Sequence, residues 1–203
     1  QQKNNHMQTA FIGYGELGKQ VHVLMQQTFP AMTAVFFDDE MAKEKSADSF
    51  PFSSYEEEAY KNYSFLICLG YKQFLEKQKI LHRLSELNRT VLSFYHSSCY
   101  INPTALIGDG VIMYPMCNID KDVKIGKGVL LNNGVTVSHN TEIGDCCYLS
   151  PGVVLSGNVK LGKKTFIGSG AVVANNVIVG ANVIMGIGTV VTKDVPGNSC
   201  VIG

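Results

Sequence analysis

An aliphatic residue stands at every sixth position from Ile101 to Val191 without a break. A helix repeats near 3.6 residues and an ordinary strand near 2, so a period of six predicts short parallel strands wound into a solenoid. A second column of small or β-branched residues follows four positions later, for example at Val111 and Val135. Each short strand then points two side chains inward, and stacked coils bury one continuous core. Glycine follows the large aliphatic residue at positions 108, 126, 144, 162, 168, 180 and 186, where a corner needs an unhindered backbone.

The part of the chain before this repeat has a different pattern. Apolar stretches at 9–13, 33–37, 64–69 and 91–95 predict strands, and helical patterns follow the first stretch and cover about 73–87. Alternating strands and helices predict a small parallel sheet with crossover helices. We therefore predict a Rossmann-like α/β domain at 8–96 and a parallel β-helix at 97–203. Residues 1–7, which end at Met7, look like an expression remnant.

Composition narrows the classes of partner. The 203 residues carry a formal net charge of zero without a Lys/Arg cluster, which gives no electrostatic reason to expect nucleic acid or membrane partners. No apolar run is long enough to span a bilayer. The six cysteines show no CxxC spacing, and scattered cysteines of this kind are typical of a reducing cytoplasm.

A glycine motif, Gly13-Tyr14-Gly15-Glu16-Leu17-Gly18, lies between the first predicted strand and the first predicted helix. Such a turn lets a phosphate approach the amides at a helix N-terminus, and Asp38 and Asp39 stand where an acidic residue usually meets a ribose hydroxyl. The alternative is a close-packed turn, with the two aspartates as a solvated strand end. Fewer than 95 residues supply only one half of a dinucleotide domain, so a single nucleotide fits better than NAD.

Histidines exclude one solenoid chemistry. His6 belongs to the expected remnant, His22 and His82 fit packing or surface positions on helices, and His96 marks the domain junction. Only His139 lies in the repeat. Zinc held between solenoids needs three histidine ligands, so we predict no metal site.

The glycine-motif domain is followed by a hexapeptide solenoid with Val137-Ser138-His139-Asn140-Thr141-Glu142-Ile143-Gly144 at its centre. This combination resembles the bacterial sugar-nucleotide N-acetyltransferases of bacillosamine, perosamine and viosamine biosynthesis, to which sialic-acid O-acetyltransferases are related. The resemblance covers nearly all of 8–203. It implies a left-handed β-helix, a cytoplasmic homotrimer with active sites between subunits, acetyl-CoA as co-substrate without a metal, and a place in O-antigen or lipopolysaccharide biosynthesis.

The resemblance also implies roles for individual residues. His139 matches the catalytic base, with Asn140 beside it, and Asn132 matches a position near the acceptor amine. Gly157 and Gly186 match positions whose backbone amides contact the cofactor, and Tyr148 is expected on the cofactor side. The nucleotide-sugar pocket would be formed by Gly13, Tyr14, Gly15, Gly18, Asp38, Asp39, Gly70, Tyr71 and Lys72.

Three features depart from the family pattern. Asn140 replaces a Glu or Asp that orients the imidazole, and Tyr148 stands where a second histidine is common. Glu142 and Asp145 lie near His139 in sequence, but the sequence does not show whether either carboxylate reaches the imidazole. The usual Gly-x-Pro-Ala-Lys type ending is absent from the sequence, which ends at Val201-Ile202-Gly203.

The expected reaction is transfer of acetyl from acetyl-CoA to the 4-amino group of a nucleotide-linked 4-amino-4,6-dideoxyhexose, with His139 as general base. Alternatives are O-acetylation of a sugar hydroxyl, a nicotinamide oxidoreductase, which the missing second half-domain disfavours, and a non-catalytic trimer that binds a sugar nucleotide. The sequence leaves open the nucleoside (UDP, dTDP or GDP), the C4 stereochemistry, the acyl group and the final glycan.

Overall fold

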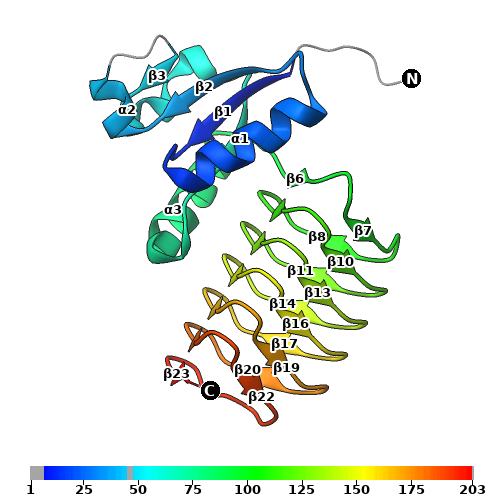
Figure 1. Ribbon diagram of the computed structural model, residues 1–203. Coiled ribbons are helices and arrows are strands. Elements are labelled where there is room, and N and C mark those ends of the chain that lie inside the picture. The colour runs from blue at the N-terminus through cyan, green and yellow to red at the C-terminus, as the bar shows by residue number, and fades with distance from the viewer. Residues whose placement is uncertain (1–6, 45–47, 203) are drawn as a thin grey trace. The chain divides into compact units, whose positions relative to one another are not determined.

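The computed structural model describes residues 7–44 and 48–202. It divides into two compact units, Gln1–Ser93 and Phe94–Gly203 (Figure 1). The sequence placed this boundary after residue 96. The difference arises at Phe94–Tyr95, which pairs with Ile112–Met113 of the solenoid. Of the expected remnant at 1–7, only Met7 lies within the described residues.

The first unit is a parallel sheet between helices. Its elements are β1 (Gln8–Ile12), α1 (Glu16–Thr28), β2 (Thr33–Phe37), α2 (Asp39–Lys43), β3 (Ser49–Phe50), β4 (Ser64–Ile67), α3 (Phe74–Glu86) and β5 (Thr90–Val91), with 3-10 turns at Phe52–Glu56, Glu58–Tyr60 and Tyr71–Gln73. The strands are parallel in the order β3-β2-β1-β4-β5. The predicted βα pattern is confirmed, with β3, α2 and the first two 3-10 turns as additions.

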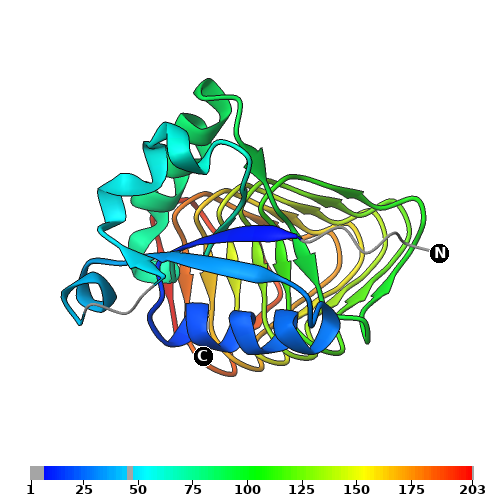
Figure 2. The same cartoon turned by 90° about the horizontal axis from the view of Figure 1, so that it is seen from above.

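Alternation along β1 and β2 explains the two-sided packing of this sheet. Ile12 and Phe37 face one side, where they pack with Ile80 of α3. Phe11 faces the other side, where its ring lies 5.2 Å from that of His22 on α1. The two long helices therefore cover opposite faces of the sheet (Figure 2).

The strand predicted at 91–95 is split between the units. The Leu92 amide donates to Phe65 O, which keeps β5 in the first sheet. The Phe94 amide donates to Val111 O, which starts the solenoid at β6. A continuous apolar run cannot show where pairing changes sheet, which explains the error.

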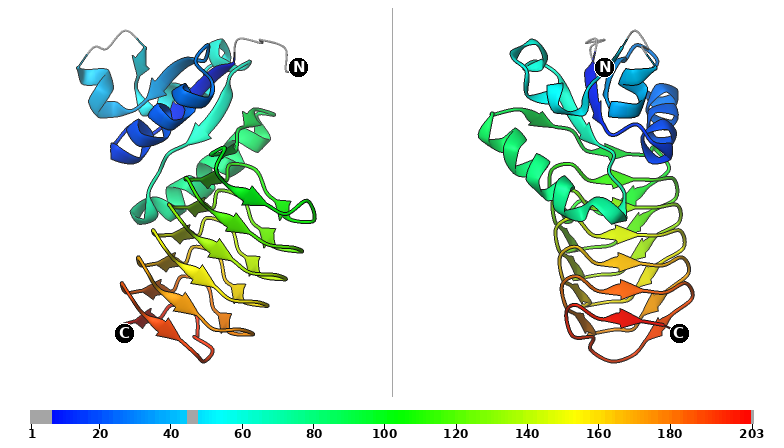
Figure 3. Two further views of the ribbon diagram at one scale, coloured as in Figure 1. Left: turned by 45° about the vertical axis from the view of Figure 1, so that its right-hand side comes forward. Right: turned by 90° about the vertical axis from the view of Figure 1, so that its left-hand side faces the viewer.

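The second unit is a parallel β-helix with three faces of two-residue strands (Figure 3). The first face comprises β6 (Phe94–Tyr95), β9 (Ile112–Met113), β12 (Leu130–Leu131), β15 (Tyr148–Leu149), β18 (Phe166–Ile167), β21 (Ile184–Met185) and β23 (Cys200–Val201). The second comprises β7 (Tyr100–Ile101), β10 (Asn118–Ile119), β13 (Thr136–Val137), β16 (Val154–Leu155), β19 (Val172–Val173) and β22 (Val190–Val191). The third comprises β8 (Leu106–Ile107), β11 (Lys124–Ile125), β14 (Glu142–Ile143), β17 (Lys160–Leu161) and β20 (Ile178–Val179).

Both predicted inward columns form the core of the β-helix. Leu131, Val137 and Leu149 have no exposed surface, and neither do Val135 and Val153 of the second column. The corners explain the glycines: a Cβ on Gly144 would lie 2.6 Å from the backbone nitrogen of Lys163 in the next coil. Glycine is therefore needed there for close stacking of the coils rather than for an unusual φ.

Candidate active site

His139 lies at the exposed corner between β13 and β14. The residue one coil further on is Gly157, and a Cβ built there would be 2.6 Å from both Cε1 and Nε2 of the imidazole. The ring therefore lies directly against the Gly157 backbone. The missing side chain at this position leaves the space in which the predicted base sits.

Asn140 belongs to a ladder of asparagines that follows the same corner. It adopts φ +58°, a left-handed conformation that asparagine tolerates better than most residues. Its Nδ2 donates to Oδ1 of Asn158 at 3.2 Å, and Asn158 donates in the same way to Asn176 at 3.1 Å. The Asn140 amide thus connects neighbouring coils, and its predicted role in catalysis stays a prediction.

The two carboxylates that could have replaced the acidic residue after His139 are engaged elsewhere. Glu142 pairs with Lys124 at 2.9 Å, and the Asp145 carboxylate accepts from the Lys127 amide at 2.7 Å. Within residues 7–44 and 48–202, no group hydrogen-bonds to or ion-pairs with the His139 imidazole. One chain therefore presents the imidazole without an orienting group.

Asn132 and Tyr148 are brought together by the fold. Asn132 Nδ2 donates to the Tyr148 hydroxyl at 3.5 Å, and Asn132 Oδ1 accepts from the Asn133 amide at 2.8 Å. The Tyr148 ring lies 5.6 Å from that of Phe166 on the same face. Asn132, however, follows β12 while His139 follows β13, so they occupy different corners of one coil.

The two glycines expected to offer amides to the cofactor already use those amides. The Gly157 amide donates to Asn175 Oδ1 at 2.8 Å, and the Gly186 amide donates to Val201 O at 2.8 Å. Contact with a cofactor through these amides would require shared or exchanged hydrogen bonds. Both cofactor roles stay predictions, and Gly157 has a second role in accommodating His139.

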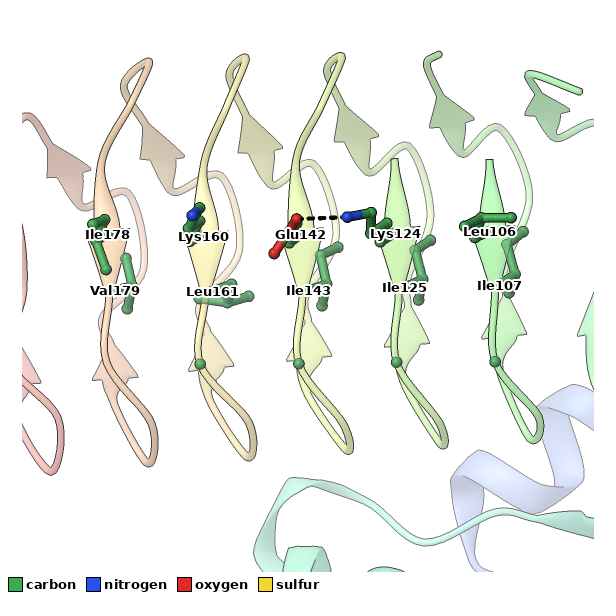
Figure 4. A pocket seen from close by; sticks show the side chains of 14 residues that line it. Leu106, Ile107, Lys124, Ile125, Glu142, Ile143, Lys160, Leu161, Ile178 and Val179 are labelled. Atoms are coloured by element: carbon green, nitrogen blue, oxygen red, sulfur yellow. Dashed lines mark hydrogen bonds and ion pairs between the residues drawn. The ribbon is translucent and has the colours of Figure 1, made fainter. Parts of the chain in front are cut away.

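A shallow groove of about 600 Å³ runs along the third face (Figure 4). Its outward side chains repeat once per coil and are Leu106, Lys124, Glu142, Lys160 and Ile178. Two aliphatic ends thus flank a charged centre, and Lys124, followed by Lys160, lowers the pKa of Glu142. His139 precedes β14 but does not line the groove. The groove was not predicted from the sequence, although the residues whose side chains line it recur in every third hexapeptide.

The glycine motif of the first unit contains glycines with different structural roles. Gly13 adopts φ +85°, and a Cβ on Gly18 would collide with Gly13 O, so both are needed by the turn itself. Within the described residues, a Cβ on Gly15 or on Gly70 would meet no atom within 4 Å. These two positions have open space beside them.

The open space lies at the carboxyl ends of adjacent strands. Gly15 caps α1 after β1, and Gly70 follows β4, the neighbour of β1. Because β2 and β4 lie on opposite sides of β1, this edge is the topological switch point, where open α/β sheets bind ligands. Tyr71 and Lys72 are exposed beside it. The structure therefore brings both predicted parts of the nucleotide-sugar pocket to one edge.

Asp38 and Asp39 have structural partners. One oxygen of Asp38 accepts from the Tyr14 amide at 2.9 Å, and the other accepts from the amides of Glu40 and Met41 at 3.1 and 3.2 Å, capping α2. Asp39 accepts from the Phe52 amide at 2.9 Å. Both carboxylates thus fix loops around the glycine turn, and their expected contact with ribose stays untested.

Tyr14 packs into an aromatic cluster. Its hydroxyl lies 2.6 Å from His22 Nδ1, and its ring centroid is 4.0 Å from that of Phe36. Burial, with a smaller effect of Cys68, raises the pKa of Tyr14, and burial lowers the pKa of His22. His22 is therefore a packing residue, as predicted.

Neither a metal centre nor a membrane span is present in the described part of the chain. Residues 7–44 and 48–202 contain no group of three or more His, Cys, Asp or Glu side chains arranged to hold a metal ion. No helix in the same ranges is long and apolar enough to cross a membrane.

Comparison with known proteins places this geometry in context. A sequence model of the bacterial transferase hexapeptide (six repeats) matches residues 122–157. The acetyltransferase domain of PglB from Neisseria gonorrhoeae FA1090, in complex with acetyl coenzyme A, is 25% identical over 98% of this chain and 97% of that chain, with a TM-score of 0.86. PerB from Caulobacter crescentus, in complex with CoA and GDP-perosamine, is 26% identical over 96% of this chain and 93% of that chain, also with a TM-score of 0.86.

The resemblance to the sugar N-acetyltransferases is confirmed. WeeI from Acinetobacter baumannii AYE matches as well, at 25% identity over 98% of this chain and 97% of that chain, with a TM-score of 0.86. No curated protein matches the sequence significantly. The structural matches confirm the predicted fold class, an α/β domain followed by a left-handed parallel β-helix. They also support the prediction that the chain is an acetyltransferase.

Proposed function

We propose that the protein transfers acetyl from acetyl-CoA to the amino group of a nucleotide-linked 4-amino-4,6-dideoxyhexose. The observation that carries this proposal is the exposed His139 imidazole on the Gly157 backbone, in a chain of which 96% matches a GDP-perosamine N-acetyltransferase. PerB was solved with CoA and GDP-perosamine, ligands of the two classes that the proposed reaction requires.

His139 is the general base of the proposed reaction. As the amine attacks the thioester carbonyl, a ring nitrogen of His139 accepts the amine proton, and the CoA thiolate leaves. General-base help is typically worth about 10²–10⁴-fold. Since the ring has no hydrogen bond within the described part of the chain, both nitrogens are available, one for the proton and one for an orienting group.

We further propose a homotrimer with the reaction between subunits. The support is the separation of Asn132 and His139 by β13, at two corners of one coil. We infer that a site using both residues takes them from facing corners of neighbouring chains. Acetyl-CoA would lie between neighbouring solenoids in this arrangement, and the enzyme would act in the cytoplasm on precursors of O-antigen or lipopolysaccharide.

The nucleotide is proposed to bind at the switch point between β1 and β4. The open space beside Gly15 and Gly70 and the free amides at the start of α1 suit a diphosphate. Lys72, exposed next to Gly70, can add a positive charge. The nucleoside itself is set by contacts that these residues do not define.

The test is release of free CoA thiol from acetyl-CoA in the presence of UDP-, dTDP- or GDP-linked 4-amino-4,6-dideoxyhexoses. One of these acceptors should support rapid release, and His139→Ala should lower the rate by about 10²-fold or more. His82→Ala, an exposed histidine of the first unit, is the matched control and should keep the wild-type rate. Release only with hydroxyl acceptors would identify an O-acetyltransferase, and no release with any acceptor would leave a binding protein.

A further inference from the structure

Two cysteines occupy the same step of consecutive coils. Tyr100 pairs in register with Asn118, so the residues just before them, Cys99 and Cys117, are stacked across the ladder. Neighbouring strands lie about 4.8 Å apart, which falls within the range of about 4.4–6.8 Å between Cα atoms joined by a disulfide. The backbone therefore holds the two cysteines at bridging distance.

Each thiol donates to a backbone carbonyl, Cys99 to Tyr114 O at 3.1 Å and Cys117 to Asn132 O at 3.2 Å. The neighbouring Cys117 thiol lowers the pKa of Cys99, partly opposed by burial and aided by backbone hydrogen bonds. The same interaction, with burial, raises the pKa of Cys117. Because the thiolate is the nucleophilic form, Cys99 is the thiol of the two that attacks.

The exposure of the two residues fits different roles. Cys99 is half-buried and can meet a small solute, whereas Cys117 is only 1% exposed and can be reached by Cys99. The other buried thiols differ: burial raises the pKa of both Cys68 and Cys147 to about 12. Among the described residues, only this pair therefore combines a solvent-accessible thiol with a neighbouring thiol.

We propose that Cys99 and Cys117 form a reversible intramolecular disulfide when the protein meets hydrogen peroxide. The Cys99 thiolate attacks the peroxide O–O bond, giving a sulfenic acid and one water after protonation. The Cys117 sulfur then attacks the sulfenic sulfur as its proton is lost, and a second water leaves. Two thiols and one hydrogen peroxide are thereby converted to one disulfide and two waters.

Formation of the disulfide would affect Asn132, the residue predicted to lie near the acceptor amine. The Cys117 sulfur lies 3.2 Å from Asn132 O, which accepts the thiol proton. Oxidation removes that proton, so the Asn132 carbonyl loses this hydrogen bond. The disulfide would also tie the first coils of the solenoid together, which should raise the midpoint of thermal unfolding.

The proposal is tested by adding one equivalent of peroxide to the purified full chain. All six thiols are free in the structure, and titration should show a loss of two per chain that dithiothreitol reverses. Cleavage before Asp109, which lies between the cysteines, should yield a linked pair of peptides that separates on reduction. These readouts do not depend on acetyl transfer, so they remain valid if the proposed function fails.

Variants give the controls. Cys117→Ser should abolish the linked peptides and leave Cys99 oxidised beyond the thiol, whereas Cys200→Ser, which removes the exposed cysteine of β23, should still lose two thiols. Among Cys68, Cys99, Cys146 and Cys147, Cys99 should also react fastest with an alkylating reagent at neutral pH. Thiol loss without a Cys99–Cys117 link, or a link between chains through Cys200 alone, would overturn the proposal.

Discussion

Gly157→Ala separates the position of the proposed base, His139, from the stability of the β-helix. The new Cβ would lie 2.6 Å from Cε1 and Nε2 of His139, while non-bonded carbon atoms settle at about 3.5–4.0 Å. The ring must therefore move by about 1 Å. A displacement of that size in a catalytic group can cost about 10²-fold in rate, or about 2.7 kcal/mol of transition-state stabilisation.

Stability should change little in the same variant. The φ of Gly157 lies outside the left-handed region, so alanine brings no backbone strain, and the colliding side chain is exposed and can rotate away. We expect a change of less than about 0.5 kcal/mol in the free energy of unfolding. Gly152→Ala is the matched control because it has the opposite properties. Gly152 has φ +69° and no atom near its Cβ, so alanine should cost about 1–2 kcal/mol of stability and leave the rate unchanged.

The assay is steady-state thiol release for both variants, run beside thermal unfolding. Gly157→Ala should lower kcat with little change in unfolding midpoint, and adding it to His139→Ala should cost nothing further, since the two act through one group. A wild-type rate for Gly157→Ala would refute the reasoning. A rise in KM for acetyl-CoA at constant kcat would instead assign Gly157 to cofactor binding.

Two further predictions concern stability. Asn158→Ala should cost about 1–2 kcal/mol in chemical unfolding, because Asn158 both accepts from Asn140 and donates to Asn176 while holding φ +59°. Asn158→Gly should lose less stability than Asn158→Ala, because glycine adopts a positive φ without strain. Equal losses of stability in the two variants would show that only the hydrogen bonds of the asparagine ladder matter. His22 has a lowered pKa in the folded state, so the unfolded chain binds more protons and stability should fall as pH drops below about 6.5. His22→Gln should lack this part of the pH dependence, which is measured as the unfolding midpoint between pH 5 and 8.

The solenoid could be predicted in detail because its environment repeats. Any residue of the six-residue column, such as Leu131 or Leu149, meets the same inward environment as the one before it, so the period alone identifies the core. The first unit lacks such a repeat. Asp38 shows the consequence: the sequence predicts a ribose contact for it but could not predict its hydrogen bonds from the Tyr14 and Met41 amides, because only the folded loops bring these groups together.

In the β-helix, contacts that matter for chemistry join residues one coil apart. The separation along the chain is 18 residues, because each coil contains three hexapeptides. When the sequence is aligned in rows of 18, residues of one column are therefore neighbours in space. The pairs that share a column in this way are His139 with Gly157, Asn140 with Asn158, and Cys99 with Cys117. The space for the His139 imidazole and the closeness of the Cys99 and Cys117 thiols therefore both follow from the 18-residue spacing of the coils.

The two halves of the candidate site follow a different rule. Asn132 and His139 are only seven residues apart and belong to the same coil, so their closeness in sequence suggests a shared site within one chain. The structure instead places β13 between them, because the three faces of the coil close into a prism with a corner after each strand. One corner of a chain then carries the proposed base, and another corner carries Asn132, the residue predicted to lie near the acceptor amine. Facing corners of neighbouring chains can reunite the two, which is why we expect the catalytic unit to be the oligomer rather than the single chain.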